Sequence, residues 1–172
     1  MGQNLEIKAR SVDFRKQSEI AKLLSGGEPE VIHQKDIFFN VSTGRLKLRV
    51  FSPDSAELIF YNRPDQQGPK ISQYKISKTI DPEGIKNILK SAYGIRNTLI
   101  KTRHLYLIGR TRIHFDKVES LGEFIELEVV LSDSEQLADG EKELQKLMDQ
   151  LGIKPDHLID LAYIDLLDSQ DV

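Results

Sequence analysis

Charged residues alternate with apolar ones along several segments of this 172-residue chain. Arg45, Lys47 and Arg49 are separated by Leu46 and Leu48, and the same alternation recurs near both ends of the chain. Because residues i and i+2 of a strand point to the same side, each such segment would carry one charged face. The residues on charged faces are Glu6, Lys8, Arg45, Lys47, Arg49, Glu57, Arg63, Lys75, Lys101, Arg103, Arg112, Asp116, Glu126 and Glu128.

This mixture of cations and carboxylates indicates a particular ligand chemistry. Several cations that converge on one cavity need a polyanion to relieve their mutual repulsion, and arginine binds phosphate through two hydrogen bonds where lysine offers a point charge. Carboxylates among them suit a divalent cation, since Mg²⁺ is commonly held by one or two carboxylates together with phosphate oxygens. The pattern therefore favours a metal–polyphosphate complex. The alternative is an open antiparallel sheet whose charged face is simply solvated.

The same period-two pattern predicts the elements that would position these side chains. We expect strands over residues 4–10, 38–41, 44–51, 57–63, 70–76, 99–107, 112–118 and 124–131. Short turns join most of them, which favours antiparallel pairing, and eight strands are about enough to close a barrel. The predicted fold is α+β: an eight-stranded antiparallel β-barrel, or tunnel, with a charged lumen and helices packed outside.

Capping residues predict four helices. One begins after Asp13, runs to about residue 24 and stops at Gly26; a second begins at Asp81-Pro82 and ends at Gly94. A third is expected from residue 132 or 133 to about 151, and a last one from Pro155 through the 159–167 region.

Composition excludes several classes of protein. The 24 Lys and Arg against 27 Asp and Glu give a formal net charge of −3, which argues against non-specific nucleic-acid binding. With no Cys there is no disulfide framework, thiolate metal site or cysteine nucleophile. No apolar run approaches the roughly 18 residues of a membrane span, and the charged N-terminus is unlike a signal peptide. We expect a cytoplasmic protein with a single domain over residues 1–172.

Five short blocks resemble the CYTH superfamily, the triphosphate tunnel metalloenzymes that include class IV adenylyl cyclases and thiamine triphosphatases. The blocks are residues 4–8 (NLEIK), 34–39 with 44–49 (QKDIFF, GRLKLR), 58–63 (LIFYNR), 101–103 (KTR) and 115–128 (FDKVESLGEFIELE). No single block is specific, but their order and spacing along nearly the whole chain make the resemblance strong. It is greatest to the class IV adenylyl cyclase branch, and it covers the chain as far as residues 163–167.

The resemblance implies roles for the charged residues. Glu6, Glu126 and Glu128 would hold Mg²⁺ or Mn²⁺, with Asp116 nearby as a candidate ligand of the metal or partner of a cation. Phosphate-binding candidates are Lys8, Arg45, Lys47, Arg49, Arg63, Lys75, Lys101 and Arg103. Of these residues Glu6, Lys8, Lys101 and Arg103 would act in catalysis. The four histidines, His33, His104, His114 and His157, show no metal-ligand spacing, and Tyr61, Tyr74 and Tyr163 are expected to be packing residues.

One residue departs from the family pattern. The signature Glu-x-Glu-x-Lys begins with Asn4 here, and an amide keeps an oxygen donor but brings no charge. A second metal site would thus be weakened or organised differently.

The resemblance leaves three functions open. A cyclase would convert ATP to cyclic AMP and pyrophosphate, and this is the first expectation. A triphosphatase would hydrolyse thiamine triphosphate, inorganic triphosphate or a nucleoside triphosphate, and a non-catalytic module would only bind triphosphate or polyphosphate. The expected partner is a small triphosphate (ATP, thiamine triphosphate or tripolyphosphate), not nucleic acid or membrane, and the protein is expected to be a monomer or homodimer.

Overall fold

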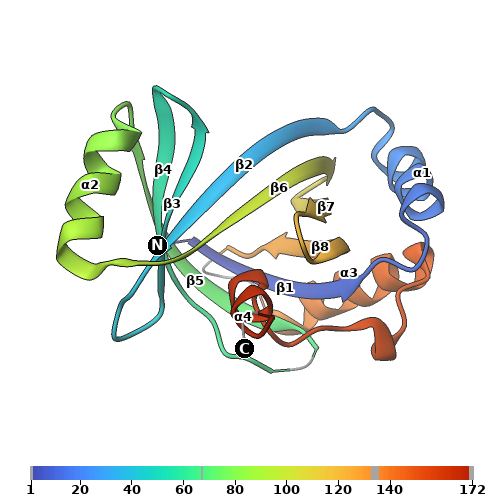
Figure 1. Ribbon diagram of the computed structural model, residues 1–172. Coiled ribbons are helices and arrows are strands. Elements are labelled where there is room, and N and C mark those ends of the chain that lie inside the picture. Colours follow the sequence, from blue (N-terminus) through green and yellow to red (C-terminus); the bar gives the residue numbers. More distant parts are fainter. Residues whose placement is uncertain (1, 67, 133–135, 171–172) are drawn as a thin grey trace.

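A computed structural model describes residues 2–66, 68–132 and 136–170 and shows a sheet that closes on itself (Figure 1). The strand order around the closed antiparallel barrel is β1-β5-β4-β3-β2-β6-β7-β8. The strands are β1 (Gly2–Arg10), β2 (Glu30–Phe39), β3 (Arg45–Ser52), β4 (Ser55–Asn62), β5 (Lys70–Thr79), β6 (Ile95–Ile108), β7 (Thr111–Val118) and β8 (Gly122–Val130). The predicted eight-stranded barrel is confirmed.

The register between strands brings residues that are distant in sequence to neighbouring positions of the inner face. Glu6 of β1 lies opposite Glu128 of β8, and Lys8 lies opposite Glu126. The intervening Leu5 and Ile7 are 2% and 1% exposed and pack outside the barrel. The charged parity of these strands therefore faces the lumen, while the apolar parity forms the core beneath the helices, as the alternation predicted.

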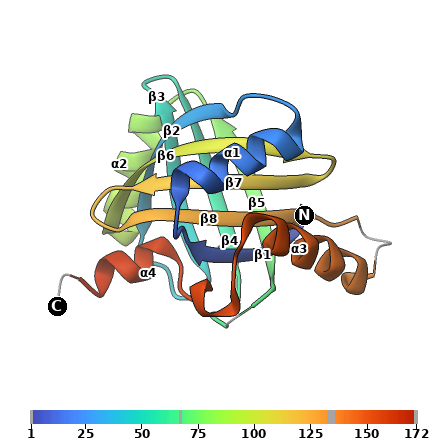
Figure 2. The same ribbon diagram turned by 90° about the vertical axis from the view of Figure 1, so that its right-hand side faces the viewer.

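Helices cover opposite sides of the barrel (Figures 1 and 2). The helix α1 (Phe14–Ser25) and the helix α3 (Leu137–Leu151) bury one large apolar cluster against β1, β6, β7 and β8. On the other side α2 (Pro82–Tyr93) packs on β2, β3 and β4 through Ile85 and Leu89. No helix in the described part of the chain is both long enough and apolar enough to cross a bilayer.

The predicted caps of α1 and α2 are confirmed. Asp13 accepts a hydrogen bond from the Lys16 amide at 3.1 Å, and Asp81 accepts one from the Gly84 amide at 2.9 Å. The α1 helix ends at Gly26, whose φ of 75° is the left-handed conformation that glycine adopts without steric cost.

The C-terminal segment closes one end of the barrel. A short 3₁₀ turn, η1 (Pro155–His157), is followed by extended chain and then by the helix α4 (Tyr163–Asp168). Ala162, Tyr163 and Ile164 pack with inward-facing Phe38 and Phe124 to fill this end of the lumen with apolar side chains. Apolar side chains thus fill the α4 end of the lumen, and charged residues line the cavity beyond it.

The structure corrects the predicted helix from Pro155 through residue 167. The Ile159 amide donates to the Lys8 carbonyl at 2.9 Å, and the buried Lys70 ammonium donates to the carbonyls of Ile159 and Asp160. These contacts hold residues 159 and 160 in extended chain, so the helix begins only at Tyr163.

Two other predicted boundaries were wrong. The β2 strand covers ten residues, whereas the sequence pattern predicted only residues 38–41, and residues 40 and 41 lie outside it. Ser132 is not helical and α3 begins at Leu137, while the other predicted start, residue 133, lies outside the described residues.

Candidate functional site

The barrel encloses a cavity of about 390 Å³, and all eight strands contribute side chains to it. This volume lies in the range of small-molecule sites. Among the described residues its lining includes seven cationic and five acidic side chains: Lys8, Lys47, Arg49, Arg63, Lys101, Arg103 and Arg112, with Glu6, Asp36, Glu57, Glu126 and Glu128. The excess of positive charge suits an anionic ligand.

One wall of the cavity carries the carboxylates of β1 and β8. Glu126 Oε1 pairs with Lys8 Nζ at 3.0 Å, Glu128 Oε2 with Arg112 Nη2 at 2.8 Å, and Glu6 Oε1 with Arg63 Nη1 at 2.6 Å. Burial and the facing charge of Glu128 raise the pKa of Glu6. The wall therefore holds three crowded acids, which a bound cation would neutralise.

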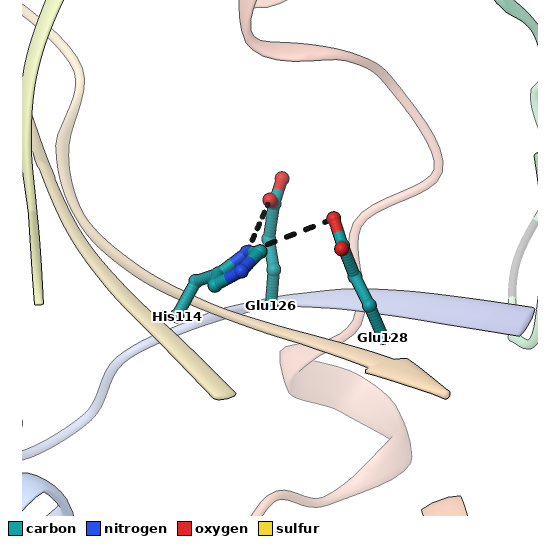
Figure 3. Close-up of side chains that lie close together, drawn as sticks. All are labelled: His114, Glu126 and Glu128. Carbon is teal, nitrogen blue, oxygen red and sulfur yellow. Dashed lines mark ion pairs between the residues drawn. The ribbon is translucent and has the colours of Figure 1, made fainter. Parts of the chain in front are cut away.

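His114 of β7 completes this acidic wall (Figure 3). Its Nδ1 lies 3.5 Å from Glu126 Oε2 and 3.6 Å from Glu128 Oε1. These three side chains offer donor atoms that all lie within 4.8 Å of one another. One imidazole and two carboxylates form a donor set that fits a divalent metal.

On the facing strands, Asp36 of β2 orients two cations. Arg49 donates to it from Nε and Nη2, both at 2.8 Å, and Lys47 Nζ lies 2.8 Å from Oδ2. Asp36 is 1% exposed; burial alone would raise its pKa, but the charges of Arg49 and Lys47 lower it well below its usual value. It stays ionised and holds both cations at the cavity wall.

A second buried aspartate, Asp116 of β7, orients two cations of β6. Arg103 donates to its two oxygens at 2.7 and 2.6 Å, the Tyr163 hydroxyl donates at 3.0 Å, and Lys101 Nζ lies at 3.5 Å. Asp116 is 0% exposed and is not among the residues that line the cavity. This is the geometry of a cation partner, one of the two roles expected for Asp116.

Arg63 of the lumen has buried hydrogen-bond donors that the described part of the chain leaves unused. Only Nη1 is engaged, by Glu6, while Nε and Nη2 are buried and have no partner among the described residues. A buried donor without a partner costs about 1–3 kcal/mol, so these atoms suit a ligand that supplies acceptor oxygens.

The structure places most of the predicted site residues together and moves two of them away. Lys75 is exposed, and its neighbours Tyr74 and Ile76 line the cavity, so Lys75 projects from the outer face of β5. Arg45 pairs with Asp65 at 2.9 Å and with Asp165 at 2.6 Å and does not line the main cavity. The structure therefore does not group Lys75 and Arg45 with the other predicted phosphate-binding residues in the main cavity.

Three residues of the site were missed or underrated. Asp36 lies in the part of β2 that the alternation did not show, and His114 and Tyr163 were assigned no role in the chemistry. Their partners come from other strands or from α4, so spacing along the chain carries no signal for them; only the register does.

Asn4, the departure from the family signature, contacts a cation. In the amide orientation that satisfies its neighbours, its oxygen accepts from Arg112 Nη2 at 2.9 Å and its nitrogen donates to the Gln3 carbonyl at 3.1 Å. The Asn4 oxygen therefore supports Arg112 rather than offering a free donor to a second metal.

A closed β-tunnel with a charged lumen and helices outside is the architecture of one protein family. The chain belongs to the CYTH domain family, whose model matches residues 2–163. Enzymes of this family act on triphosphates and depend on metal ions.

Individual relatives agree with this assignment. The chain is 29% identical to "Putative adenylate cyclase MJ0240" of Methanocaldococcus jannaschii, over 94% of this chain and 97% of that protein. The solved structure of the PH1012 protein from Pyrococcus horikoshii superimposes with a TM-score of 0.84 at 22% identity, over 95% of this chain and 98% of that one. A Hippeastrum protein described as a "putative adenylyl cyclase" with "a dominant triphophatase activity" gives 0.69 at 13% identity, over 99% and 96%. Both structures support the fold.

Proposed function

We propose that the protein is a metal-dependent enzyme that converts ATP to cyclic AMP and pyrophosphate inside the barrel. The observation that carries this proposal is that one lumen has two kinds of charged wall. An acidic wall is built by β1, β7 and β8. The other wall carries cations of β3 and β6, which are oriented by Asp36 of β2 and Asp116 of β7. The likeness to a Methanocaldococcus jannaschii protein named as an adenylate cyclase supports the cyclase reaction.

The side chains of the lumen would bind the triphosphate mostly by position and charge. Lys8, Lys101 and Arg103 are 4%, 4% and 6% exposed, so little water screens their attraction for phosphate oxygens. Phosphoryl and nucleotidyl transfer need little covalent chemistry from a protein, and preorganised cations stabilise the charge that develops at phosphorus.

The acidic wall would hold the metal. Glu126 and Glu128 with His114, and Glu6 beside them, offer the ligands, and Mg²⁺ or Mn²⁺ bound there would neutralise charge on the phosphates and support the leaving group. In the structure these carboxylates pair with Lys8, Arg103 and Arg112. Binding of a metal–triphosphate complex would exchange partners, with carboxylates turning to the metal and cations to phosphate.

A triphosphatase is the second candidate, because the Hippeastrum protein of similar fold is described with that dominant activity and the same lumen charges serve both reactions. Product analysis separates the functions. ATP, thiamine triphosphate and tripolyphosphate are each incubated with Mg²⁺ or Mn²⁺. We expect cyclic AMP and pyrophosphate from ATP; orthophosphate alone would indicate the hydrolase, and binding without turnover would contradict an enzyme altogether.

Two lysine substitutions test whether the lumen is the site. Lys101→Gln should lower kcat/KM by about 10²-fold, the cost of removing one preorganised donor. Lys75→Gln, the same change on the outer face of β5, should leave it unchanged. Equal losses in the two variants would place the reaction elsewhere.

The pH dependence of polyphosphate binding follows from Lys47. Burial lowers its pKa to about 7, with Arg49 acting in the same direction and Asp36 opposing it; Lys101 also faces it. Phosphate favours the charged ammonium, so at pH 8 tripolyphosphate binding should take up protons and the affinity for tripolyphosphate should fall as pH rises above 7.

The lowered pKa of Lys47 also affects folding. Below pH 7 the buried charged ammonium destabilises the folded protein, and this penalty is relieved as pH rises from 7 to about 10.4, the pKa of lysine in the unfolded chain.

Calorimetry checks this prediction. Titration of metal-free protein with tripolyphosphate at pH 8, in two buffers with different ionisation enthalpies, gives the number of protons taken up. Lys47→Gln should reduce that number while leaving the contribution of the ligand itself. An identical uptake in the variant would mean that Lys47 does not contact the phosphates.

A further inference from the structure

The side chain of His114 has an unexplained environment inside the lumen. It is 3% exposed, and its Nδ1 has no hydrogen-bond partner among the described residues although it faces oxygens of Glu126 and Glu128. A buried polar atom without a partner is costly. The unprotonated imidazole nitrogen that binds a metal is a lone-pair donor, as are the two carboxylate oxygens, so one cation shared by the three atoms would satisfy them together.

Two of the distances between donor atoms match a shared metal ion. Metal bonds of about 2.0–2.2 Å at tetrahedral or right angles place neighbouring ligand atoms roughly 3.0–3.6 Å apart. The distances from His114 Nδ1 are 3.5 Å to Glu126 Oε2 and 3.6 Å to Glu128 Oε1. Arg112 holds the other oxygen of Glu128, Oε2, so Oε1 is the one presented to His114.

We propose that His114 is a direct metal ligand and that its nitrogen makes this site prefer Mn²⁺ or a later divalent transition metal over Mg²⁺. Magnesium favours oxygen donors, whereas Mn²⁺ and the metals after it accept imidazole nitrogen. Asn4 adds no competing carboxylate to the wall, because it is neutral and its oxygen contacts Arg112. The inference rests on the metal site of the proposed function but concerns which ion that site selects.

Pulsed electron paramagnetic resonance of bound Mn²⁺ tests this directly. Spectra are recorded on the intact protein with Mn²⁺ alone and with Mn²⁺ plus a non-hydrolysable, nitrogen-free methylene analogue of triphosphate. We expect coupling to a directly bonded ¹⁴N nucleus in the wild type and its loss in His114→Asp. His33→Asp is the matched control, because His33 is exposed on the outer face of β2, and it should keep the coupling.

Metal affinities supply the second measurement. By calorimetry, His114→Asp should weaken Mn²⁺ or Co²⁺ binding by about tenfold or more, a change at the scale seen when metal-site partners are lost, while Mg²⁺ binding stays equal or strengthens. Bound Mn²⁺ without ¹⁴N coupling in the wild type would overturn the assignment of His114. An equal loss of Mg²⁺ and Mn²⁺ affinity in His114→Asp would overturn the selectivity.

The outcomes separate this inference from the proposed function. Turnover of a triphosphate by a protein whose Mn²⁺ shows no nitrogen coupling would leave the function standing and remove His114 from the metal. Nitrogen coupling in a protein without turnover would support the metal ligand and contradict the enzyme.

Discussion

Replacing Asp116 by Asn should lower the free energy of unfolding by about 3 kcal/mol, the low end of the cost of breaking a buried ion pair from one side. The fully buried carboxylate accepts from Arg103 and Tyr163 and forms an ion pair with Lys101, and the amide can satisfy only part of this set. In a chain of this length that loss corresponds to a melting temperature lower by roughly 6–12 °C. Differential scanning calorimetry at pH 7 measures this change.

Folding lowers the pKa of Asp116: burial would raise it, but the charges of Arg103 and Lys101 outweigh that effect. Its stabilising contribution is therefore complete above about pH 4 and is lost only as pH falls further.

Two controls distinguish the buried pair from a general sensitivity of β7 and β8. Glu123→Gln removes a carboxylate whose exposed pair with Lys117 spans 3.4 Å, and it should change stability by no more than about 1 kcal/mol. The double variant Arg103→Met with Asp116→Leu should recover most of the lost stability, since apolar replacement of both partners is often neutral. The double variant should nevertheless lose triphosphate turnover, because Arg103 is absent. A destabilised double variant would show that packing, rather than the unpaired charge, dominates.

The ion pairs of the lumen contribute both to the stability of the barrel and to the proposed function. Asp36 and Asp116 hold cations without leaving any oxygen for the ligand, whereas Glu126 and Glu128 pair with cations through contacts that a metal could replace. The first kind of acid fixes the positions of Arg49 and Arg103 whether or not phosphate is bound. The second kind offsets part of the positive charge of the lumen cations.

The barrel could be predicted because apolar and charged residues alternate strictly where one face meets helices and the other meets the lumen. This holds for Leu5 and Ile7 against Glu6 and Lys8 in β1. It fails in β2, where the inner face mixes Ile32 and Phe38 with polar residues and Val31 is exposed on the outer face, so no alternation marked most of that strand.

Lys75 shows why charge alone does not fix which face of a strand looks inward. In β5 the inner face carries Ser72, Tyr74 and Ile76, and the charged residue is on the solvent side.

His114, the candidate metal ligand, was missed for a different reason. Its neighbours Glu126 and Glu128 lie on the next strand, and only the pairing of His114 with Glu126 in the register brings them together.

Added metal should restore the activity of Glu128→Gln but not that of Arg63→Lys. Glutamine keeps an oxygen donor but loses the charge, so Glu128→Gln should raise the Mn²⁺ concentration for half-maximal activity by about tenfold, equivalent to roughly 1.4 kcal/mol. Activity should largely return at saturating metal. Glu128 is the better choice than Glu126 because its partner Arg112 is 34% exposed and can be solvated when the charge is lost, whereas Glu126 holds Lys8 and Arg103, which are nearly inaccessible.

Arg63→Lys keeps the positive charge beside Glu6 but removes the buried Nε and Nη2 donors that have no protein partner among the described residues. If these donors bind phosphate, kcat/KM should fall by about 10²-fold, and no metal concentration should restore it. Glu57→Gln provides the control, since Glu57 lines the cavity but does not belong to the three-residue donor group found in the described chain. Metal titrations of product formation in all three variants decide the matter: the metal optimum should move only in Glu128→Gln. Identical responses of Glu128→Gln and Arg63→Lys would mean that metal and phosphate are not held by separate walls of the lumen, and the division of roles proposed for the acids and the cations would have to be abandoned.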